Sequence, residues 1–253
     1  MRIVAITTST RLQGLCLRVP EQVDRVALDR YVIGQPRTLN ERLWQLLDEA
    51  NLGIESLDLI ACDVGPGSFT GLRLGLSTAR ALSWATGTAT VGVGSLEVLI
   101  EQARRGRHND AVYAGVLPSR REVIYVGVSS PAGVAEAEVQ LEELVPWLRS
   151  VETSFDGLPL CIVGPEPTAK AVYERLQSDL ATSSGEVPSA MEWQHIEAPC
   201  PEILADLAGQ IAARNEAQPA LRLVPRYLAA SEAERKAGSV IDQKPIAALA
   251  ETS

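Results

Sequence analysis

The sequence predicts an α/β protein with two similar halves, each of them a mixed β-sheet covered by helices. Three observations lead to this prediction. Short, strand-like apolar runs alternate with longer runs that have helical periodicity. The order strand, strand, strand, helix, strand, helix, strand, helix occurs twice. The pentapeptide CDVGP at residues 62–66 is echoed by CIVGP at residues 161–165, at the same point of each half.

The first half is expected to end near residue 105. Short apolar runs bounded by polar residues, Gly or Pro predict strands at residues 2–9, 12–19, 25–33, 57–64 and 89–94. Apolar residues at helical spacing predict helices at residues 38–50, 70–86 and 95–104. The second half repeats the order, with strands expected at residues 111–117, 122–129, 134–139, 158–163 and 192–197. Its helices are expected at residues 141–149, 167–180 and 201–214.

This order of elements resembles the actin/sugar-kinase/Hsp70 architecture, in which two duplicated domains flank a cleft. The resemblance implies two duplicated mixed-sheet domains in this chain. The N-terminal domain is expected over residues 1–105 and includes the glycine-rich turn and the partner-binding helices described below. The C-terminal domain is expected over residues 106–230. The polar, alanine-rich residues 231–253 are expected to form a mobile tail.

Composition disfavours several classes of function. Apolar residues make up 46% and charged residues 22%, as in ordinary soluble proteins, and no apolar run approaches the roughly 20 residues that span a bilayer. The net charge of −9 disfavours nucleic-acid binding by this chain alone. The densest basic cluster, Arg104, Arg105, Arg107 and His108, is interpreted as a solvated loop. A role on nucleic acid is therefore expected to be indirect, through a partner.

Neither the cysteines nor the histidines have the spacing of a metal site. The chain has no C-x-x-C pair, so its thiols are expected to be mostly buried and reduced, which fits a cytoplasmic protein. These thiols belong to Cys16, Cys62, Cys161 and Cys200. The two histidines, His108 and His195, are far apart in the sequence. No metal site and no catalytic residue are therefore expected.

The most distinctive stretch is CDVGPGSFTGLRLG at residues 62–75, where a strand ends, glycines allow a sharp turn and a helix begins. The N–H groups at a helix N-terminus can bind an anion such as phosphate, and Ser68 or Thr70 can cap the helix. The stretch lacks the Gly-Lys-Ser/Thr ending of a P-loop and the G-x-G-x-x-G spacing of a dinucleotide site. A plain strand-to-helix turn therefore stays an equal alternative to anion binding.

The helix after this turn carries a stripe of small residues. Gly71, Gly75 and Ala79 recur every four residues and so share one face. Glycine inside a helix costs about 1 kcal/mol relative to alanine, and a closely packed neighbour would explain two of them. That neighbour could lie within the chain. The leucines of the helix already offer a separate surface to the core, however, so we interpret the small-residue face as a partner interface.

Arg73 and Arg80 would border this interface. A large side chain at Gly75 is then expected to block partner binding and to leave the chain folded. The candidate residues for a partner interface or an anion-binding turn are Gly65, Pro66, Gly67, Ser68, Phe69, Thr70, Gly71, Arg73, Gly75, Ala79 and Arg80.

Residues 65–75, GPGSFTGLRLG, resemble the signature of the TsaB (YeaZ) family. Three further runs are similar to that family: RIVAITTST at residues 2–10, VGVGSL at 91–96 and VPRYL at 224–228. The resemblance implies a non-catalytic subunit that activates its metal-bearing relative TsaD, which makes threonylcarbamoyladenosine in tRNA. It also implies TsaE as a partner, a homodimer when partners are absent, indirect contact with tRNA, and no membrane. No cofactor is expected to bind to this chain alone. ATP or ADP could bind at the interface with the partner.

Three positions depart from the family pattern. Thr7 stands where the opening strand usually has Asp, Pro118-Ser119-Arg120 replaces Asp-Ala-Arg, and Leu39 lies near the place of a common histidine. Mg²⁺ usually binds at least one carboxylate, and neither opening strand supplies one. Asp63 is interpreted as a strand-end residue. A self-sufficient ATPase or kinase of this architecture stays an alternative, and a peptidase is disfavoured because the chain has no H-x-x-x-H.

Overall fold

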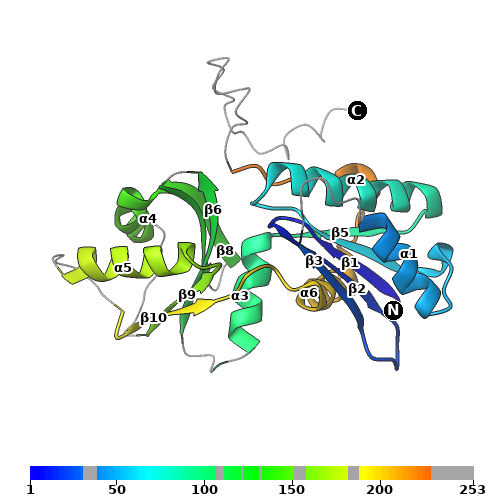
Figure 1. Cartoon of the computed structure of the whole chain (residues 1–253), viewed down its shortest axis with the longest axis horizontal. Helices are drawn as coiled ribbons and strands as arrows, with labels where there is room; N and C mark the ends of the chain where they lie inside the picture. The colour runs from blue at the N-terminus through cyan, green and yellow to red at the C-terminus, as the bar shows by residue number, and fades with distance from the viewer. Residues whose placement is uncertain are drawn as a thin grey trace, which may run out of the picture.

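The computed structural model of the chain describes residues 1–30, 39–105, 107, 111–120, 122–130, 133–150, 158–181 and 188–228. These residues form two five-stranded sheets with helices on their faces (Figure 1). The first sheet has the strand order β3-β2-β1-β4-β5. The second sheet, taken from its matching edge, has the order β8-β7-β6-β9-β10. Each strand of one sheet thus has a counterpart in the other, which confirms the predicted duplication and the fold class.

The first sheet consists of β1 (Ile3–Thr7), β2 (Leu12–Arg18), β3 (Arg25–Arg30), β4 (Leu59–Asp63) and β5 (Thr90–Val93). β1 is antiparallel to β2 and parallel to β4, so the sheet is mixed. Every residue of β1 and β4 is buried, as expected for central strands that are covered on both faces. Helices α1 (Leu39–Glu49) and α2 (Phe69–Thr86) share an apolar cluster with one face of this sheet.

The second sheet consists of β6 (Val112–Arg120), β7 (Val123–Ser130), β8 (Gly133–Gln140), β9 (Leu160–Gly164) and β10 (Met191–His195). Its pairings repeat those of the first sheet, with β6 antiparallel to β7 and parallel to β9. Helices α4 (Leu144–Ser150) and α5 (Thr168–Ala181) share an apolar cluster with one of its faces. The two echoed pentapeptides begin in β4 and β9, which hold matching places in the two sheets.

The remaining two helices pack across the order of the chain. Helix α3 (Ser95–Arg105) follows β5 but packs on β6 and β7 of the second sheet. Helix α6 (Pro201–Ala213) follows β10 but returns to β1, β2, β4 and β5. Figure 1 shows both helices in the middle of the molecule, between the two sheets. Each half therefore supplies a helix that covers the sheet of the other half.

The division at residues 105 and 106 stays a prediction about domains, because these exchanged helices belong by packing to the opposite sheet. The chain after α6 also returns to the first sheet: Gln218 forms an antiparallel bridge with Thr90, and Leu223 is fully buried in the first core. The tail expected at residues 231–253 lies outside the described residues, as do residue 38 and residues 31–33. No helix in the described part of the chain is long and apolar enough to cross a membrane.

Candidate partner interface

The glycine-rich stretch is a buried turn that connects β4 to α2. Val64, Gly65 and Pro66 are all buried, and Gly65 has a φ of +98°, a conformation that favours glycine. Ser68 is the N-cap of α2, because its side chain accepts a hydrogen bond from the N–H of Gly71 at 3.3 Å. Ser68 N–H donates in turn to the carbonyl oxygen of Ser9 at 2.6 Å. Capping by Ser68 is thereby confirmed, and Thr70 lies inside the helix.

Asp63 joins three segments just before this turn. It is fully buried, and its carboxylate accepts hydrogen bonds from the N–H groups of Thr8 and Ser9 at 3.0 and 3.1 Å. The hydroxyl of Ser95, at the start of α3, donates to the same carboxylate at 3.4 Å. Burial raises the pKa of Asp63, and these hydrogen bonds oppose the rise. Asp63 is the last residue of β4, as the sequence predicted. Its carboxylate links the end of β4 to the loop after β1 and to the start of α3.

The small-residue face of α2 is turned inward. Gly71, Gly75 and Ala79 are all buried, and Ala79 has no exposed surface. A Cβ atom on Gly71 would clash with the carbonyl oxygen of Thr8, and one on Gly75 would clash with the Thr8 hydroxyl. The close neighbour is therefore the loop after β1, and the interpretation of this face as the partner surface is wrong. The leucine pattern misled because Leu74 is 37% exposed and does not belong to the core.

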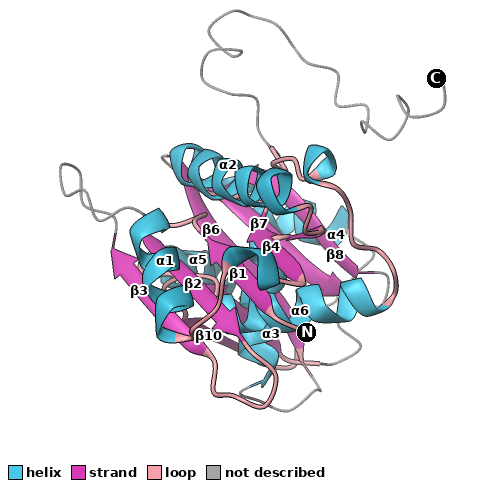
Figure 2. Ribbon diagram, turned by 90° about the vertical axis from the view of Figure 1, so that its right-hand side faces the viewer, coloured by secondary structure: helices cyan, strands magenta, loops and turns pink. Residues whose placement is uncertain are grey.

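The opposite face of α2 is exposed and carries large apolar side chains. Phe69 is 40% exposed, and Trp84, near the other end of the helix, is 89% exposed. Arg73 and Arg80 lie on this face as well, and the guanidinium carbon of Arg73 is 3.9 Å from the centroid of the Phe69 ring. Both views of the molecule place α2 at its periphery (Figure 1 and Figure 2). The exposed face is thus open to a partner.

Two neighbouring segments extend this apolar face. On one side, α1 presents Trp44, which is 50% exposed, and the hydroxyl of Thr78 in α2 donates to the side chain of Asn40 in α1 at 3.5 Å. On the other side lies the chain after α6, whose Tyr227 ring centroid is 5.4 Å from that of Phe69. We call the whole the α2 surface, and its exposed apolar residues are Trp44, Phe69, Leu74, Trp84, Leu221, Val224 and Tyr227.

These seven are more than half of the twelve large apolar side chains that are exposed in the described part of the chain. Such a concentration of exposed apolar side chains marks an interaction site. The sequence pattern missed it because the exposed Leu74 lies between the buried Leu72 and Leu76 and has no distinguishing signal of its own. Trp84 and Phe69 were the available signal, since aromatic residues are enriched at interfaces.

The basic cluster near the end of α3 is paired with acidic groups. Arg105 pairs with Glu101 and Asp206, and Arg107 pairs with Glu192. The charges of these two arginines are thereby compensated at the surface. His108 lies outside the described residues.

One hollow is lined by residues of both halves of the chain. It has a volume of about 560 Å³, and its lining includes Arg11, Ser119, Glu166, His195 and Glu197. The Glu197 carboxylate pairs with Arg30, and the Ser119 hydroxyl donates to Glu138. No group of three or more His, Cys, Asp or Glu side chains in the described residues is arranged to hold a metal ion.

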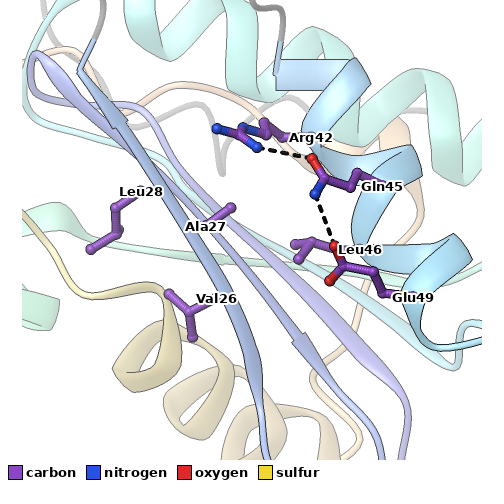
Figure 3. Close-up of a pocket in the computed structure, with 7 residues that line it drawn as sticks. All are labelled: Val26, Ala27, Leu28, Arg42, Gln45, Leu46 and Glu49. Carbon is purple, nitrogen blue, oxygen red and sulfur yellow. Dashed lines mark hydrogen bonds between the residues drawn. The ribbon is translucent and has the colours of Figure 1, made fainter.

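A smaller hollow of about 270 Å³ lies between β3 and α1 (Figure 3). Arg42 donates to Gln45 at 2.9 Å, and Gln45 donates to Glu49 at 2.8 Å, as the dashed lines in Figure 3 show. Arg42 also donates to Asp29 of β3 at 2.7 Å. The polar groups of this hollow therefore bond to one another and tie α1 to the edge of the first sheet.

All four cysteines are free thiols, and three of them are buried, as expected. Burial raises the pKa of Cys16, Cys62 and Cys161, and it raises that of the half-buried Cys200 to about 11. A raised pKa keeps a thiol protonated and unreactive at neutral pH. None of the four therefore has the character of a catalytic nucleophile.

The chain is similar to known proteins of tRNA threonylcarbamoyladenosine biosynthesis. Residues 37–133 match the family model of TsaD, the tRNA N6-adenosine threonylcarbamoyltransferase. Over 244 residues, the chain is 28% identical to the tRNA threonylcarbamoyladenosine biosynthesis protein TsaB of Bacillus subtilis (strain 168), covering 93% of this chain and 97% of that protein. The structure of YeaZ from Pseudomonas aeruginosa superimposes with a TM-score of 0.68 at 25% identity, covering 89% of this chain and 99% of that one.

A second Pseudomonas aeruginosa structure, of an uncharacterised protein with similarity to peptidase YeaZ, shares the fold. Its TM-score is 0.71 at 24% identity, and the match covers 90% of this chain and 99% of that one. The chain is thus similar along almost its whole length to a tRNA threonylcarbamoyladenosine biosynthesis protein TsaB, and it shares its fold with YeaZ.

Proposed function

We propose that this chain is a non-catalytic subunit that binds and activates the metal-bearing transferase TsaD, and that it does so through the α2 surface. The observation that carries the proposal is the concentration of exposed apolar residues on α2 and its two neighbours. The side chains of Trp84 and Leu221 are 89% and 80% exposed to water, which does not stabilise a monomer. Binding of a partner that covers them would be favoured by the free energy of burying this apolar surface.

The chemistry of the surface fits a partner with a similar fold. The TsaD family model matches residues 37–133, a range that contains both α1 and α2. TsaD would therefore carry helices of the same kind, and two such faces can pack about a pseudo-two-fold axis. Two copies of this chain could pair by the same arrangement when TsaD is absent. TsaE would join the assembled pair, and tRNA would contact this chain only through the complex.

The opening strands support a non-catalytic role. Thr7 is buried in β1, and its hydroxyl donates to the carbonyl oxygen of Gly14 at 3.4 Å. Pro118 and Ser119 hold the corresponding place in β6. Neither strand offers the carboxylate that usually binds Mg²⁺ beside a nucleotide phosphate. ATP or ADP, where the complex uses it, would then depend on groups of the partner.

A self-sufficient ATPase or kinase is the second candidate, and the hollow of about 560 Å³ that both halves line is the observation in its favour. Its carboxylates are Glu166 and Glu197, and Glu197 is already paired with Arg30. Measuring ATP turnover by the purified chain with Mg²⁺ separates the two candidates. Turnover at the rate of a kinase would reject the non-catalytic role.

The decisive test of the α2 surface compares two variants, Trp84→Glu and Val23→Glu, in which the replaced side chains are about equally exposed. Trp84 on α2 is 89% exposed, and Val23, between β2 and β3, is 88% exposed. Trp84→Glu is expected to weaken binding to the TsaD of the same organism at least tenfold, because it places a charge in an apolar interface. Val23→Glu is expected to bind like the wild type. Equal binding by all three proteins in isothermal titration calorimetry would reject the α2 surface as the interface.

A further inference from the structure

The segment after α6 forms one border of the α2 surface, and it is anchored in the first half by its backbone. Leu223 is fully buried in the first core. The N–H of Arg226 donates to the carbonyl oxygen of Val64 at 2.6 Å, in the glycine-rich turn. A Cβ atom on Gly65 would lie 3.1 Å from the carbonyl oxygen of Arg226, so the two backbones run close together.

The side chain of Arg226 extends to the other half. Its Nη1 atom donates to Oε2 of Glu136 at 2.9 Å, and Glu136 belongs to β8 of the second sheet. Only 6% of the Glu136 side chain is exposed, against 46% of the Arg226 side chain. The ion pair therefore links the border of the α2 surface to a buried carboxylate of the opposite sheet.

The surroundings make the buried Glu136 carboxylate depend on Arg226. Oε1 of Glu136 has no hydrogen-bond partner among the described residues, so Arg226 provides its compensation. Burial raises the pKa of Glu136, and the charge of Arg226 opposes the rise. A Cβ atom on Gly94 would lie 3.0 Å from both Glu136 Oε1 and Arg226 Nη1, so the pair lies in a closely packed space. Removing Arg226 would leave the charge of the buried Glu136 carboxylate uncompensated, which is costly.

Tyr227, the residue after Arg226, contacts the exposed face of α2. The ring of Tyr227 lies against that of Phe69, the first residue of α2, with the two planes tilted by 32°. Arg73 covers Phe69 as well. Two contacts thus connect the second sheet to the exposed face of α2: the ion pair of Glu136 with Arg226, and the ring contact of Tyr227 with Phe69. Arg226 and Tyr227 are neighbours in the chain.

We infer that Glu136 is a positioning residue for partner binding: through Arg226 it holds Tyr227 against Phe69, so that the second sheet shapes the TsaD-binding face of the first. The inference rests on the proposed binding of TsaD at the α2 surface. It adds a residue of the opposite half that the partner would not itself contact. Partner affinity then depends on the placement of β8 relative to α2.

A double-mutant cycle tests whether Glu136 acts through Tyr227. The variants are Glu136→Gln, Tyr227→Ala and both together, in the full chain, titrated with the TsaD homologue of the same organism by calorimetry. Glu136→Gln is expected to weaken binding about fivefold to tenfold in the wild-type background and less than twofold when Tyr227 is already Ala. A purely structural effect of Glu136→Gln would weaken binding equally in both backgrounds and would overturn the inference.

Two controls complete the experiment. Glu216→Gln breaks an ion pair with Arg214 on the same segment, where both side chains are more than half exposed, and it is expected to leave binding unchanged. Circular dichroism shows whether each variant is folded at the titration temperature. Should Glu136→Gln not fold, Arg226→Lys approaches the same pair from the exposed side and is expected to weaken binding in the same direction.

The outcomes separate this inference from the function on which it rests. Wild-type chain that does not bind TsaD would reject the proposed function, and the inference with it. Wild-type binding together with unchanged affinity of the Glu136→Gln and Arg226→Lys variants would reject the inference alone.

Discussion

The carbonyl oxygen of Thr8 occupies the space that a side chain on Gly71 would need. Helix α2 therefore approaches the loop after β1 to backbone distance, and the hydroxyl of the same Thr8 fills the space beside Gly75. This contact fixes the orientation of α2. Because its glycine face is directed inward, its aromatic residues are directed outward, and the glycine-rich signature indirectly determines which side chains the α2 surface exposes.

The first prediction concerns two helical glycines with opposite surroundings. Gly75→Ala is expected to destabilise the chain by about 1–3 kcal/mol, because the new methyl group overpacks against Thr8. Gly209→Ala in α6 is the matched control, since its Cβ would lie 3.5 Å from Ile3 Cδ1, an ordinary contact. It is expected to stabilise the chain by about 0.5–1 kcal/mol through the better helix propensity of alanine. Urea unfolding measures both.

This expectation replaces the one drawn from the sequence, in which a large residue at Gly75 would block the partner and leave the fold intact. A Gly75→Leu variant with wild-type stability and lost TsaD binding would restore the small-residue face as the interface.

The second prediction concerns the cap of α2. Ser68→Ala removes the side chain that accepts from Gly71 N–H and is expected to cost about 1 kcal/mol of unfolding free energy. Ser77→Ala is the control, because the Ser77 hydroxyl lies in the middle of the same helix and donates to the carbonyl oxygen of Leu74. It is expected to change the unfolding free energy by less than about 0.5 kcal/mol. An equal loss in both variants would contradict a capping role.

The third prediction concerns the pH dependence of stability at the contact between α3 and α6. Asp206 of α6 pairs with Arg105 of α3 and with Arg18 of β2. Burial alone would raise the pKa of Asp206, but the hydrogen bonds and charges of the two arginines outweigh it and lower the pKa below its ordinary value. A lowered pKa means that the carboxylate stabilises the fold above the pKa of unfolded Asp, about 3.9, and that this contribution is lost as pH falls further.

The measurement is the difference in unfolding free energy between wild type and Asp206→Asn from pH 6 to pH 2.5. Carboxylates that the two proteins share cancel in this difference. It is expected to favour the wild type at pH 6 by about 1 kcal/mol and to shrink below pH 4. A difference that stays constant over the whole range would show that the charge of Asp206 contributes nothing.

The fourth prediction concerns the thiols. Cys200 is the one described cysteine with partial exposure, and its pKa of about 11 leaves about a thousandth of it as thiolate at pH 8. The folded chain is therefore expected to react with a disulfide reagent at pH 8 at least tenfold more slowly than free cysteine. All four thiols are expected to react after unfolding in guanidinium. Fast labelling of one thiol in the folded chain would reveal an activated cysteine.

Local patterns were sufficient to predict the elements and the duplication. The alternation of short apolar runs with helical runs reflects which side of each element is buried, and it gave strands and helices close to those of the structure. The exchange of α3 and α6 was not predictable in this way, because an apolar helix face does not specify which sheet it covers.

The same limit explains the misjudged face of α2. Gly71 and Gly75 correctly indicated close packing, but periodicity carries no information on whether the neighbour belongs to the chain. Thr8, the actual neighbour, is distant in the sequence and has no distinguishing pattern of its own. Trp84 and Leu74 lie among the other apolar residues of α2, and their exposure can be assigned only once the helix has been placed on its sheet.

The exchanged helices have a consequence for the order of events during synthesis on the ribosome. One face of the first sheet is covered mainly by α6. Apart from Val98 of α3, the apolar cover of Ala5 and Leu59 comes from residues 201–213, which leave the exit tunnel late. The N-terminal half must therefore wait, with that face open, while the whole second sheet is being translated. A pause late in translation would prolong the exposure of nascent chains to chaperones, and truncation before α6 would leave an aggregation-prone product.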